Sequence, residues 1–321
     1  MIKNQLGSSI TYQDGFAPSR YDKPLSLLRN WFFFLKQRFK HTQSLDIYHI
    51  TGVLHYLFVA LPRRRTILTI HDCVKIHQQK GIKKWFAWLL WFKLPCTYFK
   101  YITVVSEQTK RELIQLTNCN PDKIIVIHNP LDPAIRYHPK AFNSEMPTVL
   151  HIGTAENKNL PRLIKALVGL ACRLWIVGRL DKDTITMLTT NQISFENFVD
   201  CDDDQIRTLY QQADIVSFVT TYEGFGLPII EAQATGRVVL TSQLQPHQEI
   251  GGEGACYVNP YYIEEIRHEI LELIQNTQKR ELLIIKGLEN VKRFEAAKIS
   301  TSYLQLYHYI HQTLCAVSPE L

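Results

Sequence analysis

The sequence predicts an α/β protein with two domains, each containing a doubly wound parallel sheet. A length of 321 residues suits about two domains of ordinary size. Short apolar and β-branched segments alternate with amphipathic segments of helical period, which indicates parallel strands joined by crossover helices. The charge also divides the chain, because residues 1–145 hold 21 Lys and Arg against 9 Asp and Glu, whereas the rest holds 15 against 21.

The predicted first domain covers residues 1–140. A helix is expected over residues 24–40, where a proline suits the first turn and apolar residues follow a 3.6-residue period. Residues 1–23 are polar and show no apolar strand ahead of this helix. Strands are expected within residues 44–52, 66–70, 101–105 and 121–133.

The predicted second domain covers residues 147–300 and is followed by a closing helix over residues 301–321. Pro and polar residues over 134–147 predict a linker between the domains. Strands ending in glycine are expected at 149–153 and 173–178, and amphipathic helices at 263–275 and 278–294. Alternation of strands and helices again predicts a parallel, doubly wound sheet.

Composition limits the cellular setting. Seven scattered cysteines show neither the close pairs of a zinc site nor the even count of a disulfide framework, so reduced thiols are expected. The N-terminal residues lack the apolar region of a signal peptide, and the longest apolar run, Trp85–Phe92, is far shorter than the roughly 20 residues of a spanning helix. We therefore expect a cytoplasmic protein, without a bound metal, that can lie at the inner face of the cell membrane.

The positive charge of the first domain predicts an anionic partner. No known nucleic-acid motif is present, and residues 81–101 mix lysines with Trp, Phe and Tyr, as a helix in a lipid headgroup region does. An anionic membrane surface is therefore expected to contact Lys83, Lys84, Trp85, Trp88 and Lys93. The alternative is a core helix whose lysines reach outward to water. Residues 24–40 admit the same two interpretations.

The stretch Ala213–Ser242 predicts a strand, a loop, a helix and a second strand. Gly224 and Gly226 allow the loop to turn sharply, Pro228 suits the first turn of the helix, and Gly236 suits its end. The loop therefore opens onto a helix N-terminus, whose free N–H groups and dipole favour a phosphate.

Two carboxylates flank this loop. Seven residues separate Glu223 from Glu231, which lies about one turn into the predicted helix. Because helical side chains lean toward the N-terminus, both carboxylates can face a ligand whose phosphates rest on the loop. The alternative is an ordinary strand–helix–strand unit with two surface glutamates.

The string EGFGLPIIEAQATG, residues 223–236, resembles the donor-binding signature of retaining family 4 glycosyltransferases, the "glycosyl transferases group 1" type. Further segments follow the family's order: SEQT at 106–109, NPLD at 129–132, and Gly-Thr with Lys-Asn within 153–159. His71 directly follows a predicted strand, as a histidine does in this family. The resemblance implies the GT-B fold, in which two Rossmann-like domains face each other across a cleft.

The resemblance also implies roles for individual residues. Glu223 would hold hydroxyls of the transferred sugar, Glu231 the ribose hydroxyls, and His71 the sugar or leaving-group side. Lys158 would neutralise the phosphate, with Arg162 or Arg179 assisting, because Thr154 stands where family members commonly place an arginine. The remaining donor-binding residues would be Gly153, Phe198, Val199, Gly224, Phe225, Gly226 and Leu227. Catalysis is assigned to His71, Glu223 and Lys158, with no metal.

The leading hypothesis is therefore a retaining glycosyltransferase that moves a hexose from a nucleotide diphosphate sugar to a glycan or lipid-linked acceptor in cell-surface polysaccharide synthesis. A second hypothesis is a catalytically weak GT-B protein that acts as a binding component of a glycan-assembly complex, because residues 1–23 lack the family's first strand. A third, a non-hydrolysing nucleotide-sugar epimerase, has no specific pattern in this sequence.

Overall fold

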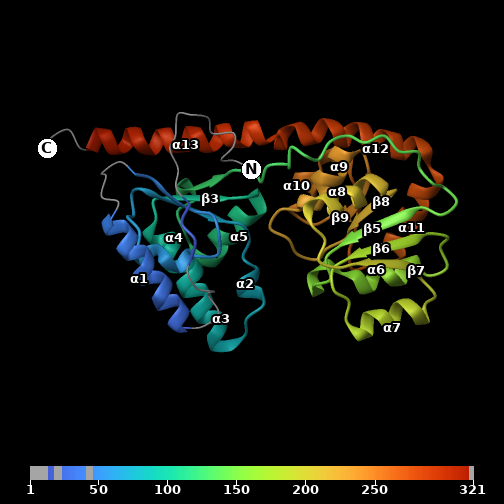
Figure 1. Cartoon of the computed structure of the whole chain (residues 1–321), viewed down its shortest axis with the longest axis horizontal. Coiled ribbons are helices and arrows are strands. Elements are labelled where there is room, and N and C mark those ends of the chain that lie inside the picture. Colours follow the sequence, from blue (N-terminus) through green and yellow to red (C-terminus); the bar gives the residue numbers. More distant parts are fainter. Residues whose placement is uncertain (1–13, 18–23, 41–45, 318–321) are drawn as a thin grey trace. The chain divides into compact units, whose positions relative to one another are not determined.

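The computed structural model describes residues 14–17, 24–40 and 46–317. The chain forms two compact units, one from Met1–Asn129 with Ala297–Leu321 and one from Pro130–Ala296 (Figure 1). Each unit contains a parallel sheet covered by helices, as the sequence predicted. The predicted absence of a first strand concerns residues 1–23, which lie outside the described residues apart from 14–17.

Unit 1 has a four-stranded parallel sheet whose strands follow chain order among the described residues. The strands are β1 (Tyr48–Ile50), β2 (Thr66–Ile70), β3 (Tyr101–Val104) and β4 (Ile124–Val126). All residues of β2 and β3 are buried, which explains why both segments are nearly continuous apolar and β-branched runs. Each strand lies within a segment predicted from the sequence.

The helices of unit 1 include one long segment with a π-helical turn in its middle. In chain order the α-helices are α1 (Pro24–Lys40), α2 (Val74–His77), α3 (Gly81–Trp88), α4 (Leu94–Tyr98) and α5 (Glu107–Thr117). A π-helical turn over Leu89–Lys93 joins α3 to α4, so residues 81–98 are helical without a break. Short 3₁₀ turns occur at His55–Val59 and Pro121–Lys123. Ser106 caps α5 through its side chain, which accepts the Thr109 N–H.

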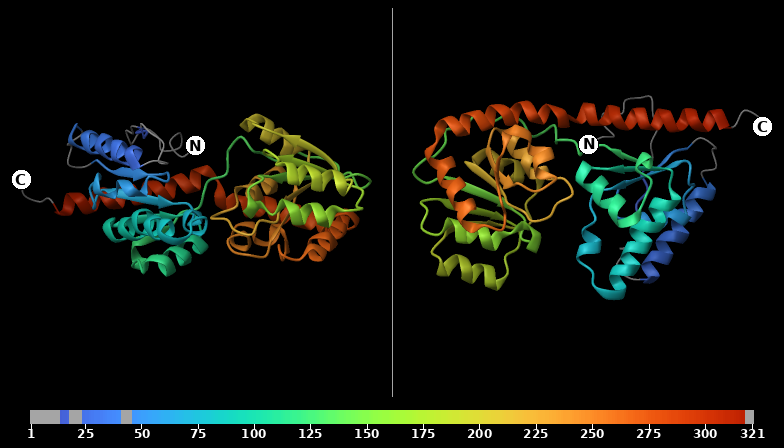
Figure 2. Two further views of the ribbon diagram at one scale, coloured as in Figure 1. Left: turned by 90° about the horizontal axis from the view of Figure 1, so that it is seen from below. Right: turned by 180° about the vertical axis from the view of Figure 1, so that it is seen from behind.

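Helix α13 (Ala296–Val317) begins at the end of unit 2 and belongs to unit 1 from residue 297 onward (Figures 1 and 2). The buried cluster that joins it to the sheet consists of Ile67, Tyr101 and Ile127 on the sheet side and Ile299, Tyr303, Leu306 and Ile310 on the helix. A polar contact adds to this packing, because His49 Nδ1 lies 2.7 Å from the Tyr307 hydroxyl. The predicted closing helix therefore exists, and it starts earlier than predicted.

Unit 2 has a six-stranded parallel sheet in the order β10-β9-β8-β5-β6-β7. The strands are β5 (Thr148–Ile152), β6 (Arg173–Val177), β7 (Ser194–Phe198), β8 (Ile215–Phe218), β9 (Val238–Ser242) and β10 (Cys256–Val258). The helices are α6 (Leu160–Leu167), α7 (Lys182–Thr190), α8 (Asp203–Gln212), α9 (Leu227–Thr235), α10 (His247–Gly251), α11 (Ile263–Gln275) and α12 (Thr277–Asn290). Short 3₁₀ turns lie at Glu156–Lys158, Gly252–Gly254 and Val291–Phe294.

The stretch predicted as a linker packs on unit 2. The backbone N–H of Leu131 donates to Phe294 O at 2.8 Å, and the N–H of His138 donates to Thr235 O at 3.2 Å. Lys140 forms an ion pair with Asp214. Unit 2 therefore begins at residue 130, ahead of the boundary at 140 drawn from composition, because backbone and charge contacts of this kind leave no compositional mark.

Candidate active site

The strand order of unit 2 places a topological switch point between β5 and β8. From β5 the chain proceeds outward through β6 and β7, then returns to the other side of β5 with β8. Loops at the carboxyl ends of two such strands diverge, which leaves a crevice where open α/β sheets bind ligands. The loop after β5 holds residues 153–159, and the loop after β8 holds residues 219–226. Both segments were singled out from the sequence.

The glycine loop has the conformation that its sequence predicted. Gly226 has φ +111° and precedes the first residue of α9, and Gly236 has φ +78° just past its last residue. Pro228 lies in the first turn, as expected. The first turn of α9 thus places the positive end of the helix dipole and the Leu227 amide at the loop, whereas Pro228 has no N–H and the Ile229 N–H donates to Gly226 O at 3.0 Å.

The two loops meet in an ion pair. Lys158 Nζ lies 2.7 Å from Glu223 Oε1, with both side chains about four-fifths buried. Gly153 has φ +97°, which favours glycine, and a Cβ there would lie 2.9 Å from Lys158 Cε, so a side chain at this position would push the lysine away from the strand end. The structure thus brings together Gly153, Lys158 and Glu223, three residues that the sequence placed in one site.

Two asparagines in the loop after β5 hold the loop after β8, and neither was assigned a site role from the sequence. Asn157 Nδ2 donates to Tyr222 O at 2.9 Å and to Glu223 Oε1 at 3.2 Å. Asn159, buried with φ +64°, donates to Val219 O at 2.9 Å. Asparagine tolerates this left-handed backbone better than other non-glycine residues, so the ENKN string was a usable signal for a functional turn.

Two buried histidines lie in unit 2 near the switch point, His247 next to the loop after β8 and His151 on β5. His247 Nε2 is 3.1 Å from Thr220 Oγ1, and its ring lies edge-on to Phe218. Burial lowers the pKa of His247 to about 4, and the charge of Lys158 acts in the same direction. Burial likewise lowers the pKa of His151, on β5, to about 4. Both rings are therefore neutral near pH 7. Neither histidine was selected from the sequence as a site residue.

Glu231 lies in the second turn of α9, and its Oε2 accepts a hydrogen bond from the Tyr210 hydroxyl at 2.7 Å. Burial raises the pKa of this carboxyl, the hydrogen bond from Tyr210 lowers it, and the charges of Asp132 and Asp203 raise it. Glu231 thus lies on the helix about one turn from its start, as predicted. Its hydrogen bond with Tyr210 of α8 was not predicted.

The remaining predicted donor-binding residues differ in how far their side chains are exposed to solvent. Val199 is 44% exposed, whereas the Phe198 carbonyl accepts the Gly178 N–H at 2.8 Å and its ring packs edge-on to Trp175. Phe225 is 4% exposed against Phe294, so its part in a ligand site is confined to its backbone. Leu227, 39% exposed, starts α9.

The loop after β6 lies against Thr154. A Cβ on Gly178, which has φ +128°, would lie 3.0 Å from the Thr154 methyl group. The two arginines considered as phosphate partners have other partners in unit 2. Arg179 pairs with Asp200 at 2.8 Å, and Arg162 NH1 donates to Asn159 Oδ1 at 2.8 Å. Lys158 is therefore the predicted cation that the structure places against the glycine-loop carboxylate.

His71 lies in unit 1, separate from the residues above. It directly follows β2, as predicted, and is exposed at the carboxyl end of the sheet. Its Nε2 lies 2.9 Å from the Thr51 carbonyl oxygen, which follows β1. The histidine is thus held at the edge where parallel sheets bind ligands.

The residues of the basic aromatic segment that were assigned to a membrane surface differ in exposure. Lys83, Lys84 and Trp85 are exposed on α3. Trp88 instead donates to Leu116 O at 2.7 Å, and Lys93 Nζ donates to Thr117 O at 2.6 Å. These two carbonyls lie at the C-terminal end of α5, which a lysine satisfies well. Trp88 and Lys93 are therefore half-buried and hydrogen-bonded within unit 1, unlike the exposed Lys83, Lys84 and Trp85.

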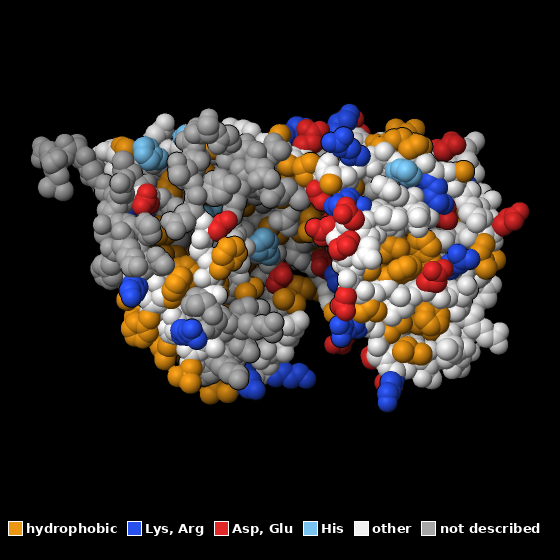
Figure 3. All heavy atoms as spheres, viewed as in Figure 1, with side chains coloured by type: hydrophobic (Ala, Val, Ile, Leu, Met, Phe, Trp, Pro, Cys, Tyr) orange, Lys and Arg blue, Asp and Glu red, His pale blue; other side chains and the backbone are white. Residues whose placement is uncertain are grey.

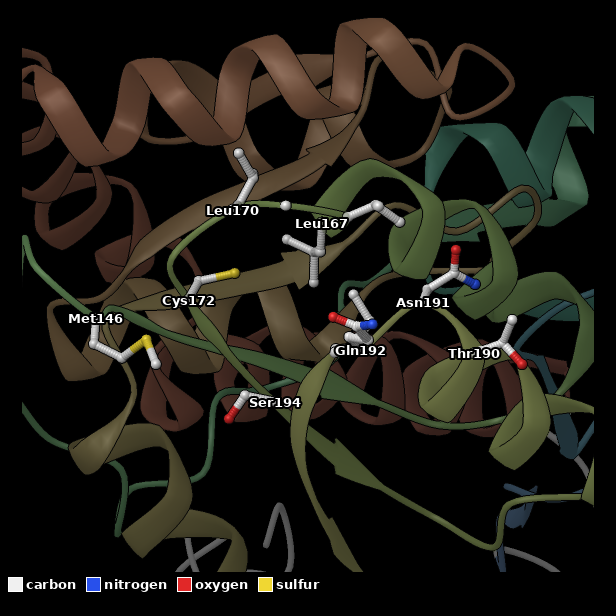
Figure 4. Close-up of a pocket in the computed structure, with 11 residues that line it drawn as sticks. Met146, Leu167, Leu170, Cys172, Thr190, Asn191, Gln192 and Ser194 are labelled. Carbon is white, nitrogen blue, oxygen red and sulfur yellow. The ribbon is translucent and has the colours of Figure 1, made fainter.

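A pocket of about 480 Å³ lies at the amino ends of strands in the unit 2 sheet (Figure 4). Its lining comes from the segments that lead into β6 and β7, with Leu167, Cys172, Asn191 and Gln192 among the residues. These segments precede the strands, so the pocket lies away from the carboxyl-end crevice that holds Lys158 and Glu223.

Two family models match the chain, one in each half. The model described as Glycosyltransferase Family 4 matches residues 9–135, and the model described as Glycosyl transferases group 1 matches residues 146–276. The chain belongs to the glycosyltransferases that these two models describe, and it has the GT-B fold. The second match contains Lys158, Glu223 and Glu231.

Relatives among characterised proteins are bacterial mannosyltransferases. The chain is 26% identical over 277 residues to O-antigen chain mannosyltransferase B of Escherichia coli, covering 77% of this chain and 71% of that protein. It is 26% identical over 227 residues to O-antigen chain mannosyltransferase RfbU of Salmonella typhimurium, covering 63% of this chain and 58% of that protein.

Solved structures share the fold of this glycosyltransferase. Sucrose-phosphate synthase of Thermosynechococcus elongatus matches with a TM-score of 0.77 at 17% identity, covering 92% of this chain and 82% of that one. HepE of Anabaena, crystallised with UDP and glucose, matches with a TM-score of 0.74 at 16% identity, covering 89% of this chain and 83% of that one.

Proposed function

We propose that this glycosyltransferase moves a mannosyl or related hexosyl group, with retention, from a nucleotide diphosphate sugar to a glycan or lipid-linked acceptor of cell-surface polysaccharide. The observation that carries the proposal is the Lys158–Glu223 pair at the switch point, directly beside the N-terminus of α9. The names of the two mannosyltransferase relatives support mannose as the sugar and a polysaccharide as the product.

The chemistry requires charge stabilisation on the departing diphosphate. The amides at the start of α9, the dipole of that helix and Lys158 are fixed donors for this charge, and such preorganised groups contribute most where charge develops. Glu223 accepts hydrogen bonds from hydroxyls of the transferred sugar, and Glu231 from the ribose. Because amides and a lysine supply the neutralisation, the mechanism we propose needs no metal.

The transfer proceeds as a displacement on one face of the sugar. The bond between the anomeric carbon and the β-phosphate oxygen breaks, and the acceptor oxygen bonds to the same face of that carbon. The acceptor proton passes to the departing phosphate oxygen, so no protein nucleophile is required. His71, on the acceptor-side unit, contacts the sugar or leaving-group side in this proposal.

A donor screen tests the function. The full chain is incubated with GDP-mannose, UDP-glucose, UDP-galactose and UDP-N-acetylglucosamine, with lipid-linked and free glycan acceptors, and products are read by mass spectrometry. We expect GDP-mannose to give a product one hexose heavier than the acceptor. Binding of nucleotide sugars without transfer to any acceptor would favour a binding component of an assembly complex. Absence of nucleotide-sugar binding would contradict the proposal altogether.

We also propose that α3 rests on an anionic membrane surface. Ile82 is 72% exposed, Trp85 and Phe86 are about half exposed, and Lys83 and Lys84 lie beside them. Figure 3 shows hydrophobic side chains next to Lys and Arg at the lower end of unit 1. Exposed aromatic and basic residues in one helix suit the headgroup region. No described helix is both long and apolar enough to cross a bilayer.

Replacing Lys83 and Lys84 by glutamine tests this contact. Each lysine near an anionic surface contributes about 1 kcal/mol, so the double variant should bind vesicles of phosphatidylcholine and phosphatidylglycerol at least about tenfold more weakly in co-sedimentation. The control is Lys165→Gln with Lys182→Gln, two exposed lysines of unit 2. Equal vesicle binding by the two double variants would refute a specific role for α3.

A further inference from the structure

Tyr210, on α8, is fully buried, and its hydroxyl points at a carboxylate of the neighbouring helix α9. The hydroxyl donates to Glu231 Oε2 at 2.7 Å. Among the described residues, no hydrogen bond reaches Oε1 of the same carboxylate. One oxygen of Glu231 is therefore fixed by the protein, and the other is left for a ligand.

The groups around Glu231 oppose its ionisation, so the hydrogen bond from Tyr210 matters for its charge. The charges that face it from its neighbours are those of Asp132, in the segment that enters unit 2, and Asp203, in the first turn of α8. Both oppose ionisation of Glu231, and so does its burial. Arg207 lies 3.3 Å from Asp132 and also pairs with Asp204, so part of the acidic charge is balanced.

Tyr210 is suited to act against these effects. Burial and the nearby carboxylate raise the pKa of Tyr210 well above its ordinary value, so its hydroxyl keeps its proton and remains a donor. A hydrogen bond to a charged acceptor is stronger than one between neutral groups. The phenol ring is held by close packing, so the direction of its O–H is set by the fold.

We propose that Tyr210 is a positioning residue for the nucleotide sugar. It holds Oε2 of Glu231, favours the ionised form of the carboxylate, and turns Oε1 toward the ribose hydroxyls of the nucleotide. This inference rests on the proposed function, because it needs Glu231 to bind ribose. It assigns to Tyr210 a role in recognising the nucleotide's sugar, separate from the transferred hexose that Glu223 holds.

A comparison of ribose and deoxyribose nucleotides tests the role. Calorimetric titration of the full chain with UDP, GDP and their 2′-deoxy forms measures the preference for the 2′-hydroxyl. A hydrogen bond to a charged group corresponds to roughly a tenfold to hundredfold preference. We expect Tyr210→Phe to reduce that preference by about tenfold, mainly by weakening binding of the ribose form.

The control removes a similar hydrogen bond elsewhere in unit 2. The Tyr257 hydroxyl donates to Gly252 O at 2.6 Å, so Tyr257→Phe loses a comparable bond away from Glu231. Both variants can lose thermal stability, but we expect only Tyr210→Phe to change the 2′-hydroxyl preference. The ratio of two affinities in one folded variant is insensitive to a uniform loss of stability.

The pH dependence of nucleotide binding gives a second readout. Binding through an ionised Glu231 weakens as pH falls through the pKa of that carboxyl. Because the Tyr210 hydrogen bond lowers this pKa, its removal should move the weakening to higher pH. We expect that shift in Tyr210→Phe and not in Tyr257→Phe.

Two results would overturn the inference in distinguishable ways. If Glu231→Ala abolishes the 2′-hydroxyl preference while Tyr210→Phe keeps it, Glu231 binds ribose and Tyr210 does not position it. If neither UDP nor GDP binds the unaltered chain, the proposed function fails, and the role of Tyr210 fails with it.

Discussion

Replacing Lys158 by methionine is expected to lower kcat for sugar transfer by about two to three orders of magnitude. The ammonium group lies 2.7 Å from Glu223 beside the first turn of α9, where the diphosphate would rest. Methionine keeps most of the side-chain volume and removes the charge. Loss of one preorganised donor to a developing negative charge costs about 10²–10³ in kcat. Steady-state kinetics with the donor identified by the screen measures the effect.

Lys165→Met is the matched control for this experiment. Lys165 lies exposed in the last turn of α6, so its loss should leave kcat within a factor of about two. A Lys158→Met variant that folds normally and retains the kcat of the unaltered chain would show that the phosphate charge is neutralised by other groups. The helix dipole and the amides at the glycine loop would then be the main source of positive potential at the phosphate.

Alanine at Gly226 is expected to lower the free energy of unfolding by about 1–3 kcal/mol and to abolish tight nucleotide binding. The backbone there has φ +111°, a conformation that residues with a Cβ rarely adopt. An added Cβ would also lie 3.1 Å from Ile229 Cδ1 and 3.5 Å from Phe218 Cε1. The isoleucine can move, but the backbone strain remains, and relieving it would displace the amides at the start of α9.

Urea unfolding and nucleotide titration of Gly226→Ala measure the two effects. Gly52→Ala serves as the control, because a Cβ at Gly52 would meet no atom within 4 Å and its φ is not in the left-handed region. Unchanged stability together with unchanged nucleotide affinity in Gly226→Ala would mean that the loop tolerates a side chain. The geometric argument for its glycine would then be wrong.

The sequence was sufficient for the features that depend on local backbone chemistry. The strand, loop and helix of residues 213–242 followed from β-branched residues, from glycines at positions of positive φ and from Pro228 in a first helical turn. The side-chain cap of α5 by Ser106 was predictable for the same reason. Each of these depends on a few neighbouring residues, whose preferences can be read directly.

Contacts between distant parts of the chain could not be predicted. Asn157 holds the loop after β8 from 65 positions away, and Tyr210 meets Glu231 across two helices. Lys93 was placed on a membrane surface because its helix is basic and aromatic. Its actual partner, the Thr117 carbonyl, lies 24 positions along the chain at the end of another helix. Pairings of this kind depend on how helices pack, which hydrophobic period alone does not determine.

Helix α13 has a consequence for the order in which the protein acquires its structure during synthesis. The strands of unit 1 leave the ribosome before unit 2, but the apolar surface around Ile67, Tyr101 and Ile127 is covered by residues of α13, among them Ile299, Tyr303, Leu306 and Ile310. Unit 2, a continuous stretch from Pro130 to Ala296, is complete before that helix exists. Unit 1 therefore finishes folding only after unit 2 has been synthesised, and until then it presents a surface that a chaperone would recognise.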